Sequence, residues 1–346
     1  MKHGYAIWLL VMLSMSSCFK KEEPLVLPTG SSDIATFNLG QGYEKEVYFD
    51  LSTNSFQERR WADWDIRFES GKDGWGVFIN TGKNMSVRKV NEFQLFEDEA
   101  SDTNKIKEIP ELLEPPEGKA ATSAMNEWQS YKRVQVSTFY GIYVIELKWI
   151  AGHKRFKRLQ IQAVNDSFYY VRITDIYDQN NQVIGTGETL EIPKDDRQNY
   201  TYYSFGNGGH VVNNAEPDKH TWDFVFTRYT HIFYNVLPNN APFNYIVSGV
   251  LSNTNKVEVA KDSAVTSFDE INAGSINKYT FSTNRNAIGY DWKSHALGPG
   301  GAYTIAPKLT YIIRDTDGAY YKLRFLDYNN SLGQSGYPKF EFIRIK

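Results

Sequence analysis

Three short aromatic motifs occur twice in this chain of 346 residues, in the same order each time. The matched segments are 64–68 (WDIRF) with 222–226 (WDFVF), 128–131 (WQSY) with 292–295 (WKSH), and 168–173 (FYYVRI) with 340–345 (FEFIRI). Three ordered matches predict a tandem duplication, with a period far too long for a solenoid. The charged segment 193–197 carries the strand-breaking Pro193 and marks the boundary. We expect one domain at 41–193 and a second at 197–346, and a fragment from about 199 to 346 should fold alone.

Aromatic residues make up 15% of the chain, as 23 Tyr, 21 Phe and 8 Trp against five Met, and such residues favour strands. Apolar and polar residues alternate in segments such as 45–51 and 319–326. The pair Asp317-Gly318 between two such segments is a strong hairpin signal. The acidic, proline-containing segment 97–119 indicates a loop with at most a short helix. We therefore predict an all-β protein of two tandem, hairpin-rich antiparallel domains with minimal helix.

The first 17 residues have the pattern of a secretory signal peptide. A short basic start precedes an apolar stretch that ends near Leu13 and is too short to span a bilayer. Residues 15–17 (MSS) then precede the only cysteine, Cys18, which resembles the lipobox of bacterial lipoproteins, where the cysteine is acylated. We expect Cys18 to carry the lipid anchor and residues 18–40 to form a tether. The alternative is an ordinary signal peptide with a leftover cysteine.

The tether begins with residues 19–23 (FKKEE), which resemble the signal that sends some Gram-negative lipoproteins to the cell surface. A solvated tether without that signal is the alternative interpretation. No other segment approaches the length of a transmembrane helix, so the lipid would be the only membrane attachment. The sequence thus predicts an outer-membrane, lipid-anchored protein exposed at the cell surface.

Composition and motifs argue against several classes of function. A net charge of −3 argues against a nucleic-acid partner, which would need a strongly basic face. One cysteine excludes an intramolecular disulfide and a cysteine-rich metal site, and its use in the anchor excludes a thiol nucleophile. The chain has no P-loop, GxGxxG, GxSxG or HExxH motif. A hydrolase with a carboxylate pair stays open by counting alone, but we predict a protein that is not an enzyme.

The mature chain has five histidines, and haem iron accepts axial His, Met, Cys or Tyr. They are His153, His210, His220, His231 and His295. His295 lies in the glycine-rich segment 294–301, which could present an imidazole to a flat ligand or leave it as an exposed loop residue. His231 could be a half-buried strand residue or face a pocket. We expect His220 to be structural and His153 to be solvated, and no two histidines have zinc-like spacing.

The C-terminal part of the chain resembles the HmuY family of haem-binding outer-membrane lipoproteins. The segments that carry the resemblance are 222–226 (WDFVF), 318–328 (GAYYKLRFLDY) and 336–342 (GYPKFEF). The first half resembles the family more weakly, through 48–53 (YFDLST), the Trp64-Asp65 motif and 80–82 (NTG). The resemblance implies two HmuY-like β domains whose extended hairpins grip haem, and a TonB-dependent transporter that receives the haem.

Known family members hold iron through two axial side chains on separate hairpins. By this resemblance His295 falls where one ligand lies, while the hairpin expected to carry the other, at 256–263, has neither His nor Met. His231 is the candidate for a second ligand. Tyr131 stands in the first half at the position that matches His295, and Met85 or Met125 could serve as changed ligands.

We therefore predict a cell-surface lipoprotein that captures haem or a related porphyrin by binding alone. No metal is expected other than the haem iron. A first alternative is that the same hairpins bind a glycan, a peptide or a host protein. A second alternative is a purely structural surface lipoprotein.

Overall fold

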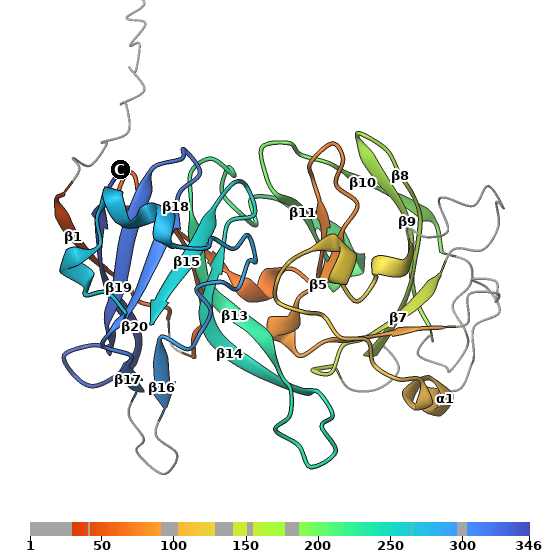
Figure 1. Ribbon diagram of the computed structural model, residues 1–346. Helices are drawn as coiled ribbons and strands as arrows, with labels where there is room; N and C mark the ends of the chain where they lie inside the picture. The colour runs from red at the N-terminus through yellow and green to blue at the C-terminus, as the bar shows by residue number, and fades with distance from the viewer. Residues whose placement is uncertain are drawn as a thin grey trace, which may run out of the picture.

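The computed structural model describes residues 30–40, 42–90, 103–128, 141–150, 155–176, 187–263, 265–295 and 303–346. The described chain consists of antiparallel sheets, one α-helix, α1 (Thr103–Glu108), and short 3-10 turns. The predicted all-β class with minimal helix is confirmed. The sheets form two halves that lie side by side (Figure 1).

The first half contains a five-stranded sheet of order β10-β9-β8-β7-β6 and a four-stranded sheet of order β12-β11-β4-β5. Its strands are β4 (Ile66–Glu69), β5 (Val77–Ile79), β6 (Ser86–Lys89), β7 (Ile142–Glu146), β8 (Phe156–Val164), β9 (Phe168–Asp175), β10 (Thr189–Pro193), β11 (Tyr200–Ser204) and β12 (His210–Val212). The core of this half includes Phe68, Trp128 and Tyr169, all buried.

The second half has a five-stranded sheet of order β1-β20-β19-β18-β15, a four-stranded sheet of order β14-β13-β2-β3, and the small hairpin β16-β17. Its strands are β1 (Ser32–Thr36), β2 (Lys45–Asp50), β3 (Ser55–Arg60), β13 (Phe224–Phe233), β14 (Phe243–Ser252), β15 (Glu258–Ser263), β16 (Lys293–His295), β17 (Tyr303–Ile305), β18 (Leu309–Arg314), β19 (Tyr320–Asn329) and β20 (Ser335–Arg344). Phe49, Phe224 and Phe340 pack in its core.

The two halves repeat one strand arrangement, but each is completed by strands from the other side of the predicted boundary at 193–197. Strand β2 pairs with β13, with Phe49 opposite Phe224, and β1 pairs with β20. In return β11 pairs with β4, with Tyr203 opposite Ile66. The hydrogen-bonded halves therefore differ from the predicted division at 41–193 and 197–346. Strand pairing between distant segments leaves no local mark in a sequence, which is why the exchange was not foreseen.

The predicted tether at 18–40 also differs from the structure at its C-terminal end. Residues 32–36 form β1 along the edge of β20, and the following Phe37 and Leu39 are buried in the core of the second half. Burial of these apolar side chains favours attachment of the segment to the fold. The predicted signal peptide and Cys18 lie outside the described residues. No described helix combines the length and apolarity needed to cross a membrane.

Direct hydrogen bonds join the two halves. The backbone N–H of Thr230 on β13 donates to Thr81 Oγ1 at 3.1 Å, and Thr230 Oγ1 donates to the carbonyl of Thr81. At a second place Asn199 Nδ2 donates to Asn253 Oδ1 at 2.8 Å. These contacts hold the β13-β14 hairpin against the first half at Thr230, well along β13, and at Asn253, just after the end of β14.

Candidate functional site

The β13-β14 hairpin has two strands of ten residues each, and its tip projects away from the sheets of the second half (Figure 1). Its two strands pair along their whole length, from Phe224 opposite Ser252 to Phe233 opposite Phe243. The neighbouring strand β2 pairs only with the first three residues of β13, as far as Phe226. The far part of the hairpin is therefore not covered by β2, and both of its edges lack a partner strand among the described residues.

One face of this far part is aromatic. Side chains two apart on a strand share a face, so His231 and Phe233 point the same way, and their cross-strand partners Tyr245 and Phe243 share that face. Tyr290, from outside the hairpin, packs against it, with its ring centroid 4.8 Å from that of His231. The His231 ring also lies 4.6 Å from the Phe233 ring. We call these five residues the aromatic hairpin face.

The aromatic hairpin face leaves apolar surface in contact with water. Phe243 is 41% exposed and Tyr245 is 55% exposed, and Tyr234 and Val236 at the tip of the hairpin are also exposed. Contiguous exposed apolar surface on a soluble domain is typical of a binding site. Two rings with free faces could pack against a flat apolar ligand.

The imidazole of His231 lies half-buried at the inner end of this face. Burial lowers the pKa of His231, because an apolar environment disfavours the charged form, and the more distant carboxylates of Asp291 and Glu117 oppose this only in part. The ring is therefore neutral at pH 7. Its contacts in the described structure are aromatic rings, and no hydrogen bond is found for it there. A neutral imidazole nitrogen without a partner can act as a metal ligand.

His295 lies elsewhere in the second half, as the last residue of β16. It is exposed, it is opposite Tyr303 in the hairpin β16-β17, and the two rings pack edge to face at 4.8 Å. Residues 296–302 of the predicted presenting loop lie outside the described residues. Among the described residues no contact joins the rings of His295 and His231. His231 packs against Phe233 and Tyr290, whereas His295 packs against Tyr303.

The other histidines and the residues considered as changed ligands divide into three groups. Met85 and Met125 are core side chains of the first half. His210 and His220 are exposed, and each has a ring nitrogen near a neighbouring turn, His210 with the Gly206 carbonyl and His220 with the Asn255 side chain. Tyr131 and His153 lie outside the described residues. No group of three or more His, Cys, Asp or Glu side chains suited to a metal ion occurs in the part of the chain that the structure describes.

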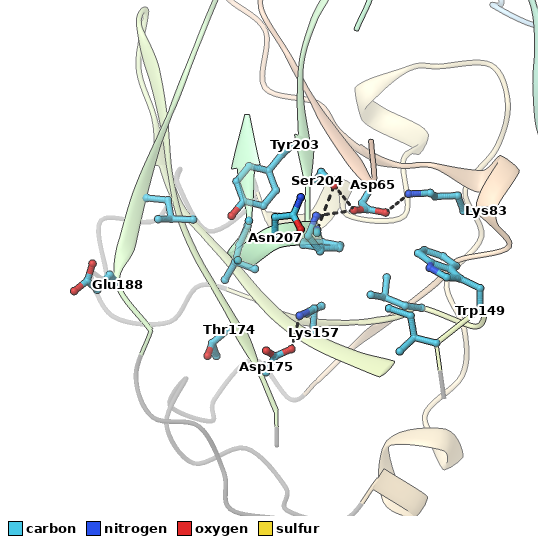
Figure 2. A pocket seen from close by; sticks show the side chains of 18 residues that line it. Asp65, Lys83, Trp149, Lys157, Thr174, Asp175, Glu188, Tyr203, Ser204 and Asn207 are labelled. Carbon is cyan, nitrogen blue, oxygen red and sulfur yellow. Dashed lines mark hydrogen bonds and ion pairs between the residues drawn. The ribbon is translucent and has the colours of Figure 1, made fainter. Parts of the chain in front are cut away.

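The structure contains a second candidate site, which the sequence analysis did not predict. It is a cavity of about 700 Å³ in the first half, at the corner formed by Asp65 of the Trp64-Asp65 motif (Figure 2). Trp149 and Lys83 lie on one side of it, Glu188 on the opposite side, and the ion pair of Lys157 with Asp175 below, in the view of Figure 2. The repeat motif marks Asp65 as structural, but the other residues that line the cavity come from segments far apart in the chain, and no local pattern predicts that they meet.

Comparisons with known proteins bear on the second half most directly. The family model HmuY, described as HmuY protein, matches residues 196–342, which confirms the resemblance seen in the sequence. No match was found among curated proteins. Apo PinO from Porphyromonas gingivitis aligns over 92% of this chain and 99% of its own, with 10% identity and a TM-score of 0.26. The Tannerella forsythia apo HmuY analog aligns over 92% and 98%, with 9% identity and a TM-score of 0.25. A putative HmuY-like heme binding protein from Bacteroides vulgatus aligns over 91% and 92%, with 8% identity and a TM-score of 0.23.

Proposed function

We infer that this chain, which matches the HmuY family model over residues 196–342, captures haem or a related porphyrin on the aromatic hairpin face without catalysing a reaction. The observation that carries the proposal is the environment of His231, a neutral, half-buried imidazole packed between Phe233 and Tyr290. The family match supports the same ligand class. The iron of bound haem would supply a Lewis-acidic centre for an axial bond.

Each part of the aromatic hairpin face has a role in this proposal. A ring nitrogen of His231 would donate its lone pair to the iron, because the lowered pKa of His231 keeps that nitrogen unprotonated at neutral pH. Phe243 and Tyr245 would pack against the macrocycle and remove their exposed surface from water. His295 is the second candidate ligand, since it stands exposed at the end of β16.

The cellular setting is part of the same proposal. Cys18 would carry the lipid anchor at the outer membrane, and the short segment before β1 would hold the fold at the cell surface. A TonB-dependent transporter would then receive the haem. The variant Cys18→Ala should be released from the membrane fraction or fail to mature, and normal processing with membrane retention would contradict the anchor.

A titration with ferric haem, followed by the Soret band, tests the function. We expect the wild type to bind, and His231→Ala to bind at least about tenfold more weakly, a loss of about 1.4 kcal/mol, because an axial bond is removed. His220→Ala is the matched control, since His220 is an exposed histidine outside the aromatic hairpin face. His295→Ala distinguishes one ligand from two. A low-spin wild-type spectrum that becomes high-spin in this variant identifies His295 as the second ligand.

Two results would contradict the proposal. The wild type could leave the haem spectrum unchanged, which would remove the haem function. His231→Ala could bind with unchanged affinity and spectrum, which would move the site away from the aromatic hairpin face.

A further inference from the structure

The cavity at Asp65 lies in the first half and shares no residue with the aromatic hairpin face. It has about 700 Å³, within the range of about 300–1,000 Å³ typical of small-molecule sites. Its walls come from β8 and β9, from the end of β11 and from the connection after β7. The question is which class of ligand its side chains would recognise.

The inner wall is a rigid polar corner. Asp65 is almost fully buried, and its Oδ2 accepts hydrogen bonds from the backbone N–H of Phe205 at 2.6 Å and from Ser204 Oγ at 3.2 Å. Its Oδ1 accepts from Lys83 Nζ, also at 2.6 Å. These three bonds fix the positions of Ser204 and of the Lys83 ammonium, which both line the cavity. Such preorganised polar groups can bind a ligand with little loss of side-chain entropy.

The outer wall carries a large aromatic ring in contact with water. Trp149 is 46% exposed, and the ammonium of Lys83 lies 5.0 Å from the centroid of its ring. Figure 2 shows Trp149 at the side of the cavity, below Lys83. An indole ring at the edge of a polar cavity can pack against a ligand that has an apolar face and polar edges.

The charges that line the cavity nearly cancel. Two cations, Lys83 and Lys157, are each paired with a carboxylate, Asp65 and Asp175, and Glu188 is the remaining charged group. A site for phosphate would need surplus cations, and a site for a metal cation would need several converging carboxylates. The described lining also lacks His, Met and Cys, so it differs from a haem ligand set. A neutral ligand fits this balance.

The amide of Asn207 adds a donor and an acceptor at the rim. Asn207 lies in the turn at residues 206–209, with a φ of 52°, and lines the cavity (Figure 2). Thr174 on β9 and Ser204 bring hydroxyl groups to the same space. The lining thus combines amide, hydroxyl, ammonium and carboxylate groups, which together can both donate and accept hydrogen bonds.

The second half shows that this opening is not a necessity of the fold. There the corresponding aspartate, Asp223, accepts from the N–H of Leu51 and of Thr316, and the short turn after β18 closes over it. In the first half Asp65 accepts from Phe205 in the same way, but Asp65 also lines the cavity, together with Trp149 and Ile150 from the described part of the connection after β7. The turn after β18 thus contacts the aspartate in the second half, whereas the aspartate of the first half borders a cavity.

We propose that the cavity at Asp65 binds a neutral saccharide, one sugar ring with vicinal hydroxyl groups. A sugar ring has C–H groups on one face, which can pack on Trp149, and hydroxyl groups around its edge, which can bond to Asn207 and to the corner at Ser204 and Lys83. This site is independent of the haem proposal and adds a second binding function in the first half.

Saturation-transfer NMR and calorimetry test the proposal on the full mature chain. The probes are D-glucose, D-galactose, D-mannose and N-acetylglucosamine, with D-glucuronate and glucose 6-phosphate as charged counterparts. We expect at least one neutral sugar to bind, Trp149→Ala to weaken it about tenfold or more, and Asn207→Gly to weaken it severalfold. Glycine is compatible with the positive φ at position 207, so that variant should keep the fold.

Tyr234→Ala is the matched control, because it removes an exposed aromatic ring of the β13-β14 hairpin instead. It should leave sugar binding unchanged. Three outcomes would overturn the proposal. No neutral sugar binds, or Trp149→Ala binds as well as the wild type with its fold intact by circular dichroism, or a charged counterpart binds more tightly than every neutral sugar. Haem binding by the same samples is measured separately, because the aromatic hairpin face shares no residue with the cavity and its result does not bear on sugar binding.

Discussion

The two aspartates of the repeated Trp-Asp motif occupy matching corners with different surroundings. Asp65 is paired with Lys83 at 2.6 Å and borders the cavity of the first half. Asp223 accepts two backbone N–H groups and has no described cationic partner, and burial beside Asp50 and Asp315 raises its pKa to about 8. The same motif therefore supports an open, ion-paired corner in one half and a closed, desolvated corner in the other.

The two aspartate corners differ in the connection that lies next to them. The chain between β7 and β8 spans residues 147–155, whereas the chain between β18 and β19 spans only 315–319 and contains the turn at Gly318, with φ of 89°. The hairpin that follows each aspartate is longer in the second half instead: β4 and β5 have four and three residues, whereas β13 and β14 have ten residues each. One scaffold has thus opened at its aspartate corner in the first half and extended its hairpin in the second.

The largest expected effect comes from separating the halves at the repeat boundary. A fragment from residue 199 to 346 lacks β1 and β2, and with them the core residues Val47, Phe49 and Leu51. We expect it to show no cooperative urea transition, in contrast to the expectation from the sequence alone. Adding a peptide of residues 30–63 should restore a transition. A cooperative transition of the fragment alone would contradict the importance of the strand exchange.

The next largest effect is expected at the two motif tryptophans. Trp222 packs edge to face on Tyr48 at 4.9 Å, and Trp64 packs on Tyr202 in the same way at 5.0 Å. Replacing either tryptophan by alanine should lower the free energy of unfolding by about 3–5 kcal/mol. We expect the smaller loss for Trp64, which is 8% exposed against 1% for Trp222. A loss under about 1 kcal/mol at either position, measured by urea denaturation, would contradict their equivalence.

A smaller effect is expected when each aspartate is replaced by asparagine at pH 7. Asp65→Asn removes the carboxylate that pairs with Lys83, and hydrogen bonds to charged groups contribute about 1.5–3 kcal/mol. Asp223→Asn keeps one acceptor and removes no charge, because the raised pKa of about 8 leaves the Asp223 carboxyl largely protonated in the fold at pH 7, so it should cost about 1 kcal/mol or less. Equal losses in chemical denaturation would show that the two corners do not differ in charge.

The last expected effect is a pH dependence at Asp223, which is spread over several pH units. Because its pKa is raised in the folded state to about 8, the folded protein binds a proton there that the unfolded chain releases at lower pH. Its contribution to stability is present below about pH 4 and is lost as the pH rises towards 8. Relative to the wild type, Asp223→Asn should therefore gain stability between pH 5 and pH 8, at up to about 1.4 kcal/mol per pH unit. Asp65→Asn is the matched comparison, and a constant difference between Asp223→Asn and wild type over this range would contradict the assignment.

Several features of the fold could be predicted because they depend on local pattern. Alternation in residues 319–326 and the Asp317-Gly318 turn lead directly to β19 and its hairpin with β18. Each copy of the motif leads to equivalent tryptophans on Tyr48 and Tyr202. The partners of these strands could not be predicted, since a strand's hydrogen-bonding edge accepts many sequences and its choice depends on long-range burial.

For the candidate sites, the sequence by itself determined the residue types, with His231 in an aromatic segment and the paired Trp-Asp motifs. Only the tertiary structure decided that Tyr290 packs beside His231 and lowers its access to water, and that Lys83 and Trp149 gather around Asp65. Burial and cavity shape depend on segments far apart in the chain, and desolvation is a property of their packing. That is why the sequence could name a histidine but not its pKa, and an aspartate but not the cavity beside it.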